Sequence, residues 1–246
     1  MFPIRDHNPS LSRPFVVYAL IALNVLIFFV QLPYMADDRA LAGFWGDRAL
    51  YPVAVTRYGD YTGIVTSMFL HAGWMHIIGN MLFLWIFGDN LEDQMGHFGF
   101  LIFYLASGIA AALAHIAAAP ASQVPTVGAS GAIAGVMGGY LLMFPKARVD
   151  VAVIIVIFLR VFTLPAWIML GFWFALQIFG GVGTSIEGGG VAYWAHAGGF
   201  VTGLLLALPL WLRRGGPAFW DRTHGKPPHP PADYPASRIP VVRRRR

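Results

Sequence analysis

The sequence of 246 residues contains no cysteine, and only 12% of its residues are charged. The absence of cysteine excludes disulfide bonds, thiolate nucleophiles and thiolate-bound metals. The low charge, with a hydrophobic content of 57% and a mean hydropathy of +0.61, excludes an ordinary soluble domain, in which about 45–50% of residues are apolar. We therefore predict an integral membrane protein with one domain, because no polar stretch is long enough for a second.

Six apolar segments approach the roughly 20 residues that a helix needs to cross a hydrocarbon core about 30 Å thick. In chain order they are Phe15–Leu32, Trp74–Phe87, Phe98–Ala119, Ser130–Phe144, Pro165–Phe179 and Val191–Leu212. The first segment has no A-x-A-like cleavage site at its end, so we expect it to be retained as a helix. The sequence thus predicts an all-α bundle of six transmembrane helices over residues 15–212.

Three further segments are not expected to cross the membrane. The stretch VDVAVIIVIFLRVFTLP, residues 149–165, is rich in β-branched residues and interrupted by Arg160, which favours an interfacial or re-entrant connection between the fourth and fifth helices. Residues 1–14 are expected to form a cytoplasmic tail. Residues 213–246 are expected to form a Pro-rich, basic and disordered cytoplasmic tail, which is either simply solvated or binds lipid headgroups.

The distribution of basic residues predicts the orientation, because positively charged loops stay in the cytoplasm. If the chain has six spans, one side of the membrane carries most of the basic residues: Arg5, Arg13, those between 146 and 160, and those of the C-terminal tail. The basic residues of the opposite side lie in the first loop, where four aspartates offset them. Both termini are therefore predicted to be cytoplasmic.

Three polar side chains on three predicted helices share one depth. Ser130, His196 and His76 each lie 16 or 17 positions from the charged residue that marks the cytoplasmic end of their helix, which is about 24–25 Å. Polar groups inside the membrane are costly and by default indicate function. A single serine commonly caps a helix and a single histidine commonly packs, but the shared depth favours a site. We expect only packing roles for the remaining candidates, His71, His97 and His115.

Small residues predict how the helices meet. Gly131 and Gly135 on the fourth helix, and Gly199 and Gly203 on the sixth, are each four residues apart, so the two backbones can approach closely. Close contact would bring the Ser130 hydroxyl within hydrogen-bonding reach of a histidine, the pairing that activates a weak nucleophile.

The predicted site is a dyad of Ser130 and His196, because no Asp or Glu occurs in the outer halves of these helices to orient the imidazole. His76 and Asn80 lie at positions i and i+4 on one face of the second helix. Together with the backbone N–H of Ser130, they would supply donors for the oxyanion of acyl transfer.

Three motifs, GASGAIAG, HIIGN and AHAGGFVTG, resemble in order and spacing the signatures of the rhomboid intramembrane serine proteases, over residues 15–212. The resemblance implies a central, short fourth helix, Ser130 as nucleophile, His196 as base, and His76 and Asn80 as oxyanion donors. It also implies cleavage of single-span membrane proteins near the outer membrane face. The expected partners are transmembrane protein substrates and lipid, not nucleic acid, and the expected location is a bacterial inner membrane. No prediction follows for the oligomeric state.

Three positions depart from or extend that resemblance. Trp45 and Arg48 are separated, although the family often has an adjacent Trp-Arg pair in the first loop. Ala134 stands where some members have an aromatic residue that stacks on the histidine, so another group must position His196. Glu92 matches a glutamate with a structural role, and we expect no catalytic role for it.

The same residues can be compared with three alternative classes of protein. An inactive rhomboid-like protein that binds or traffics membrane proteins would keep the fold but lose the serine or the histidine, and this chain has both. A transporter favours charged groups at the midplane and an internal repeat. A metalloprotease favours H-E-x-x-H, which HAGWMH does not match, so no metal or other cofactor is expected. The glycine-rich loop 180–190 and the aromatic fifth helix are two candidate gates for substrate entry.

Overall fold

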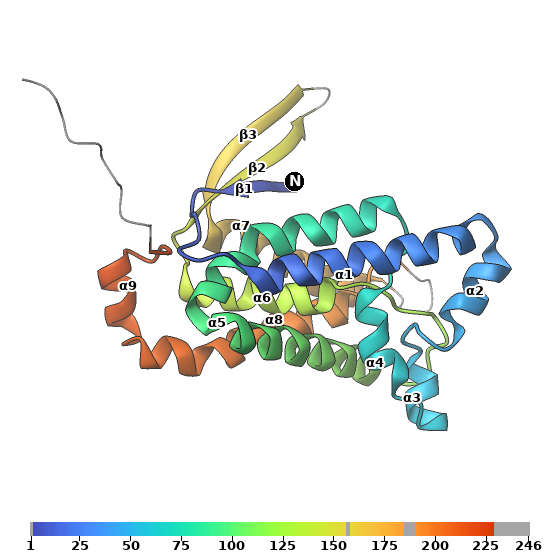
Figure 1. Cartoon of the computed structure of the whole chain (residues 1–246). Coiled ribbons are helices and arrows are strands. Elements are labelled where there is room, and N and C mark those ends of the chain that lie inside the picture. Colours follow the sequence, from blue (N-terminus) through green and yellow to red (C-terminus); the bar gives the residue numbers. More distant parts are fainter. Residues whose placement is uncertain (1, 156–157, 185–189, 229–246) are drawn as a thin grey trace, which may run out of the picture.

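Helices that run side by side form the body of the protein (Figure 1). The structure is a computed structural model that describes residues 2–155, 158–184 and 190–228. The long helices are α1 (Phe15–Gln31), α5 (Trp74–Ala118), α6 (Ser130–Met143), α7 (Ala166–Gly183) and α8 (Tyr193–Arg213). Shorter helices join or follow them: η1 (Leu32–Ala36), α2 (Asp38–Gly46), α3 (Pro52–Tyr58), α4 (Thr62–Thr66), η2 (Ser67–Phe69) and α9 (Pro217–Thr223).

The described part of the chain contains four helices that are long and apolar enough to cross a membrane: α1 with η1, α5, α7 and α8. The helix α5 is one run of 45 residues, but Gly96 breaks its helical geometry with φ 72° and ψ 163°. A side chain is rarely tolerated at such a φ, and glycine permits it. The parts of α5 before and after the break, teal and green in Figure 1, run in opposite directions along the bundle. We call them the first and second arms of α5. They correspond to the second and third predicted segments.

The helix α6 has 14 residues, and every residue from Ala132 to Tyr140 is buried. Its closest neighbour is α8. A Cβ atom on Gly199 would lie 2.1 Å from the carbonyl oxygen of Gly131, and one on Gly203 would lie 1.9 Å from that of Gly135. No side chain fits in either place, so the two backbones touch as the glycine spacing predicts.

The prediction of an all-α fold is wrong for residues 148–165, which form a β-hairpin of β2 (Arg148–Ile155) and β3 (Phe158–Pro165). The strand β1 (Phe2–Asp6) pairs antiparallel with β2, so the sheet order is β1-β2-β3. Val149 and Val151 are fully buried against the helices. The alternation of strand side chains, combined with the β-branched residues, explains why this stretch forms strands and not a re-entrant segment.

Asp150 holds β1 to the hairpin. Its carboxylate accepts hydrogen bonds from Thr163 Oγ1 at 2.6 Å, from His7 Nε2 at 2.8 Å and from Arg5 Nε at 2.7 Å. These hydrogen bonds hold the pKa of Asp150 well below its usual value, with the bond from Thr163 as the largest cause. The N-terminal segment is thereby attached to the connection between α6 and α7.

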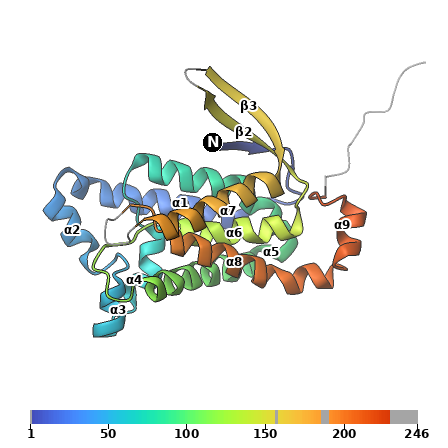
Figure 2. The ribbon, with the colours of Figure 1, turned by 180° about the vertical axis from the view of Figure 1, so that it is seen from behind.

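The prediction of a disordered tail is wrong for residues 215–228. Figure 2 shows α9 at the same end of the bundle as the sheet. Phe219 of α9 is buried against Phe144, and Trp220 Nε1 donates to the carbonyl oxygen of Leu142 at 2.9 Å. The signal was the pair of aromatic residues in a segment otherwise rich in Pro and Gly. Residues 229–246, which include the sequence VVRRRR, lie outside the described residues.

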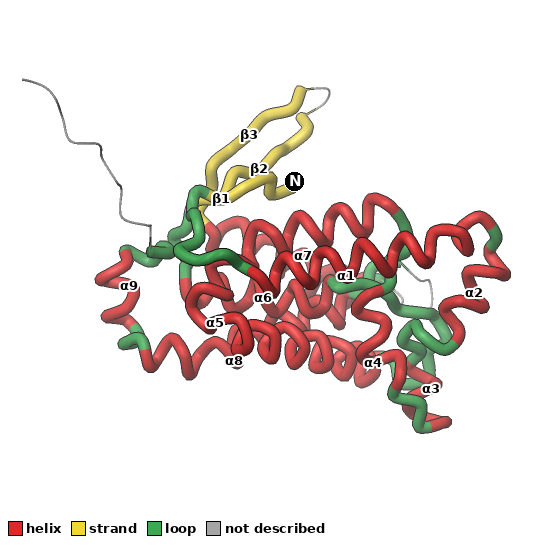
Figure 3. The backbone as a smooth tube through the Cα atoms, in the orientation of Figure 1, coloured by secondary structure: helices red, strands yellow, loops and turns green. Residues whose placement is uncertain are grey.

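Figure 3 shows the distribution of helix and strand: the strands β1, β2 and β3 gather at one end of the helices, and the short helices α2, α3 and α4 lie at the other. Glu92 secures the end that carries the sheet. Its buried carboxylate accepts from the backbone N–H groups of Val16 and Val17, both at 2.9 Å. These are donors of the first turn of α1 that have no partner within the helix. Glu92 therefore caps α1 from α5, which agrees with the structural role expected for it.

Candidate active site

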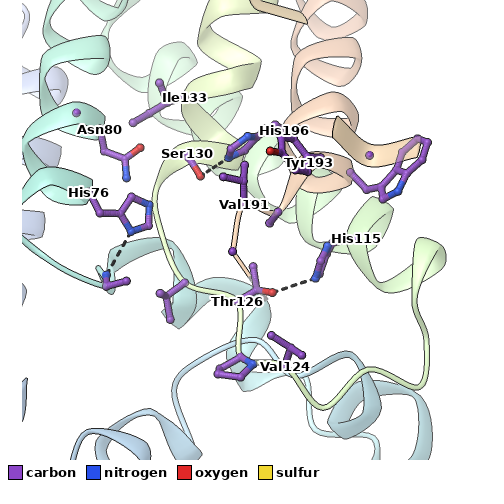
Figure 4. Close-up of a pocket in the computed structure, with 18 of the residues that line it drawn as sticks. His76, Asn80, His115, Val124, Thr126, Ser130, Ile133, Val191, Tyr193 and His196 are labelled. Atoms are coloured by element: carbon purple, nitrogen blue, oxygen red, sulfur yellow. Dashed lines mark hydrogen bonds between the residues drawn. The ribbon is translucent and has the colours of Figure 1, made fainter. Parts of the chain in front are cut away.

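A cavity of about 710 Å³ lies among the helices, and Trp45 of α2 is one of the residues that line it. Figure 4 shows many of the residues that line this cavity. Side chains from α5, α6, α7 and α8 and from the loop 124–130 border it. None of the described residues that line it is Asp, Glu, Lys or Arg. The polar groups that line it include His76, Asn80, Ser130 and His196. The cavity is therefore mostly apolar, with a small number of placed polar groups, as is typical of a binding site.

Ser130 and His196 form a hydrogen bond in this cavity. Ser130 is the first residue of α6, and its Oγ lies 2.7 Å from His196 Nε2 on α8. The glycine contact between α6 and α8 begins one residue after the serine, at Gly131. Close backbone packing and the short side-chain distance thus arise from the same contact. A neutral imidazole that accepts from a hydroxyl is the arrangement of a general base beside a nucleophile.

His76 and Asn80 lie on the other side of the serine, on the first arm of α5 (Figure 4). His76 Nδ1 accepts from the backbone N–H of Ala72 at 3.2 Å. A backbone N–H only donates, so the neutral His76 ring carries its proton on Nε2. The Nδ2 of Asn80 is buried and has no hydrogen-bond partner among the described residues. Each of the two side chains therefore has an N–H donor without an acceptor among the described residues, and both side chains line the cavity that Ser130 also lines.

Gly128 keeps the space between His76 and Ser130 open. Its φ is 129°, and a Cβ atom there would lie 2.8 Å from His76 Nε2 and 3.5 Å from Ser130 Oγ. The Gly128 N–H donates to the carbonyl oxygen of Ser67 at 2.9 Å, which fixes the loop before α6. Glycine is required here both for its φ and for the position of the imidazole.

Gln177 is a residue of the site that the sequence analysis missed. Its Oε1 lies 2.8 Å from His196 Nδ1, and its Nε2 donates to the backbone carbonyl of Trp173 at 3.1 Å. The ring of Trp173 also lies beside the imidazole, with centroids 5.7 Å apart. The sequence predicts that a group other than Ala134 positions His196. Gln177 and Trp173 are the side chains of α7 that contact its ring. The available signal was that Gln177 is the one amide or charged side chain in α7.

The histidines expected only to pack differ in their surroundings. His71 is fully buried, with its ring 5.2 Å from that of His76, and His97 contacts Glu92 outside the cavity. His115 differs from the expectation, because it lines the cavity and its Nε2 lies 2.9 Å from Thr126 Oγ1. It links the second arm of α5 to the loop that leads to the serine.

The two candidate gates both border the cavity. Thr184, Gly190 and Val191 line it from the connection between α7 and α8, and Trp173 and Gly181 line it from α7. Residues 185–189 of the predicted lid lie outside the described residues. Trp45 of α2 reaches the cavity, whereas Arg48 donates to the carbonyl oxygen of Phe44, so the two side chains do not act as a pair.

Fold and site together define a membrane protein in which a serine and a histidine on neighbouring helices meet at an apolar cavity. Residues 58–213 match the family model described as Rhomboid domain. The chain belongs to the rhomboid family, which confirms the resemblance seen in its motifs.

Similar proteins come from several kinds of organism. The chain is 32% identical over 196 residues to Rhomboid protein 1, mitochondrial, of Saccharomyces cerevisiae, covering 77% of this chain and 51% of that protein. It is 29% identical over 218 residues to Rhomboid protease GluP of Bacillus subtilis, covering 86% and 38%. It is 34% identical over 212 residues to Rhomboid-like protein 11, chloroplastic, of Arabidopsis thaliana, covering 85% and 69%. The chain thus spans about half or less of the length of the first two relatives.

Proposed function

We propose that the protein is an intramembrane serine endopeptidase with Ser130 as nucleophile and His196 as general base. The observation that carries the proposal is the 2.7 Å contact between Ser130 Oγ and His196 Nε2 at an apolar cavity. As the Oγ attacks the scissile carbonyl carbon, its proton passes to Nε2. The imidazolium then returns this proton to the leaving amine. Water, activated in the same way, hydrolyses the acyl-enzyme.

The oxyanion of the tetrahedral intermediate would bind between α5 and α6. The Nδ2 of Asn80, which has no hydrogen-bond partner among the described residues, supports this role, because a buried donor without an acceptor is costly and a developing negative charge would satisfy it. His76 would add its Nε2–H, which the bond from Ala72 leaves as a donor. The Ser130 N–H, at the start of α6, is among the helix donors without an internal acceptor and would complete the hole.

The proposed topology has six crossings: α1, the two arms of α5, α6, α7 and α8. Four of these separate β1 from β2, and the two strands pair side by side, with Arg5 opposite Asp150. An even number of crossings returns the chain to the side on which it started, so the pairing supports this count. The distribution of basic residues supports a cytoplasmic location for that side. The membrane would be the inner membrane of a bacterium.

The proposed substrates are single-span membrane proteins, cleaved near the outer membrane face. In the proposed orientation, α2, α3 and α4 lie on the outer side of the bundle (Figure 3), and the cavity that Trp45 of α2 lines would lie in the outer half. Its apolar walls suit a peptide segment that leaves a membrane helix. Rhomboid protease GluP carries the word protease in its name, which supports the activity by analogy.

Labelling by a fluorophosphonate probe tests the activity without a known substrate. The purified wild type is expected to be labelled, and both Ser130→Ala and His196→Ala are expected to lose the label. Ser107→Ala is a matched control, because the Ser107 hydroxyl is buried and without a partner among the described residues. A folded wild type that fails to react, or that reacts equally without Ser130, would favour an inactive rhomboid-like binding or trafficking protein.

Single cysteines test the topology directly, since the natural sequence contains none. Asp38→Cys at the start of α2 should react with an impermeant maleimide added to intact cells. Arg160→Cys in β3 should react only after permeabilisation. Labelling of Arg160→Cys in intact cells would overturn the proposed orientation.

A further inference from the structure

The far nitrogen of His196 contacts a neutral amide, and this contact determines which nitrogen carries the ring proton. Gln177 Oε1 and His196 Nδ1 are 2.8 Å apart. Gln177 is only 7% exposed, and it does not line the cavity. Its side chain therefore reaches the site only through the imidazole.

The orientation of the amide follows from its second contact. The other end of the Gln177 side chain lies 3.1 Å from the backbone carbonyl of Trp173. A carbonyl oxygen only accepts, so the NH₂ end must face Trp173 and the oxygen must face His196. An amide oxygen also only accepts, so His196 Nδ1 must carry the proton. The Nε2 lone pair is then free to accept the proton of Ser130.

We propose that Gln177 is a positioning residue that holds His196 in the Nδ1–H tautomer, so that Ser130, His196 and Gln177 form one chain of hydrogen bonds. The proposal rests on the proposed function for its kinetic consequences, but the tautomer itself can be measured without it. When Ser130 Oγ forms the bond to the substrate carbon, its proton moves to Nε2 and the imidazolium donates from both nitrogens. Gln177 keeps its own protons throughout, because it accepts the Nδ1–H without taking the proton.

A neutral acceptor suits this position in an apolar helix. A carboxylate would add a buried charge beside the imidazole, which is costly within a membrane. The amide supplies the acceptor without that cost. The Trp173 ring packs beside the imidazole. One turn of α7 thus contributes both the hydrogen bond from His196 to Gln177 and an aromatic contact with the ring.

Nitrogen-15 NMR of the full-length protein labelled at histidine measures the tautomer. The His196 signals are assigned as those missing in His196→Ala. The wild type should show a protonated Nδ1 and an unprotonated Nε2. Gln177→Leu should shift His196 toward a mixture of tautomers, and Gln177→Glu should restore the Nδ1–H form. Leu170→Ala, a fully buried change on the same helix, should leave the tautomer unchanged.

Kinetics on a cleaved substrate give the second measurement. Gln177→Leu should lower kcat about tenfold with KM unchanged, since one neutral hydrogen bond is lost. Gln177→Glu should recover most of that loss. Gln177→Leu should also lower the melting temperature, because the buried His196 Nδ1 loses its acceptor. A purely structural role would lower the melting temperature as well but leave the tautomer unchanged, so the tautomer is the measurement that distinguishes the two roles.

The outcomes separate the two proposals. A wild-type His196 protonated at Nε2, or a Gln177→Leu variant with an unchanged tautomer and kcat, would overturn the positioning role. If the tautomer depends on Gln177 but Ser130 never reacts with the fluorophosphonate, the positioning role stands and the protease function fails. If Ser130 reacts with the fluorophosphonate at the same rate in the wild type and in Gln177→Leu, the protease function stands and the positioning role fails.

Discussion

Replacing Gly199 by alanine should separate Ser130 from His196 without touching either. The new Cβ would lie 2.1 Å from the carbonyl oxygen of Gly131, the residue after the serine. Carbon and oxygen atoms in contact are about 3.3–3.6 Å apart, so α6 and α8 must move apart by about 1.2–1.5 Å. The obstacle is backbone, and no rotamer change relieves it.

A separation of that size is large relative to the hydrogen bond. The Ser130 to His196 distance of 2.7 Å would approach about 4 Å, beyond hydrogen-bonding range. Displacements of about 1 Å at a catalytic group cost about 10²-fold in rate. Overpacking of this kind also lowers stability by about 1–3 kcal/mol. We therefore expect the rate of fluorophosphonate labelling to fall about 100-fold.

Gly171→Ala is the matched control, since nothing lies within 4 Å of a Cβ at that position on α7. It should label at the wild-type rate and gain up to about 1 kcal/mol from its better helix propensity. Both variants are assayed well below their melting temperatures, so that loss of folded protein does not enter the rate. A Gly199→Ala variant that labels at the wild-type rate would refute the backbone contact between α6 and α8 as the origin of the short distance.

Three further predictions concern positions around the site and the sheet. Gly128→Ala should lower kcat about 10²-fold with a smaller effect on KM, because its Cβ displaces His76 from the oxyanion site; an unchanged kcat would contradict that placement. Glu92→Gln should lower the free energy of unfolding by about 1–3 kcal/mol, because an NH₂ group then faces an N–H of α1; the exposed Asp221→Asn on α9 is the control in the melting experiment. The hydrogen bonds that lower the pKa of Asp150 stabilise the sheet fully above pH about 4, the pKa of an unfolded aspartate, and this stabilisation is lost as the pH falls from there through the lower pKa of the folded protein. Amide exchange in β1, corrected for intrinsic rates, should therefore rise as the pH falls below about 4. In Asp150→Asn it should already be raised at pH 7.

The sequence could predict the long helices and the meeting of four residues at one cavity because the signals are local. Apolar length marks each span, and four-residue glycine spacing marks the faces of α6 and α8 that touch. The depth of a residue follows from counting along a helix. These three quantities suffice to bring Ser130, His196, His76 and Asn80 toward one place.

The sheet could not be predicted in the same way. Its strands β2 and β3 are adjacent in sequence, but β1 lies about 145 residues earlier, as the contact between Arg5 and Asp150 illustrates. An apolar stretch with one arginine fits a short helix, a re-entrant segment or a strand equally by composition. Only pairing with a distant segment decides among them.

Gln177 was missed for a different physical reason. The helix α7 is apolar on all sides, so hydrophobicity does not reveal which face meets α8. The rotation of the helix about its axis is set by packing against its neighbours. One polar residue among eighteen was visible in the sequence, but its direction was not.

The two histidines of the site show why residue type alone does not define a role. At His76 the far nitrogen faces a backbone N–H, which leaves Nε2 as a donor toward the cavity. At His196 the far nitrogen faces the oxygen of Gln177, which leaves Nε2 as an acceptor toward Ser130. In the proposed mechanism the same type of side chain would therefore stabilise negative charge on one side of the serine and remove its proton on the other. Exchange of either far partner for a group of opposite hydrogen-bonding character would turn a donor into an acceptor or the reverse, so we expect the proposed acyl transfer to depend on both of these contacts.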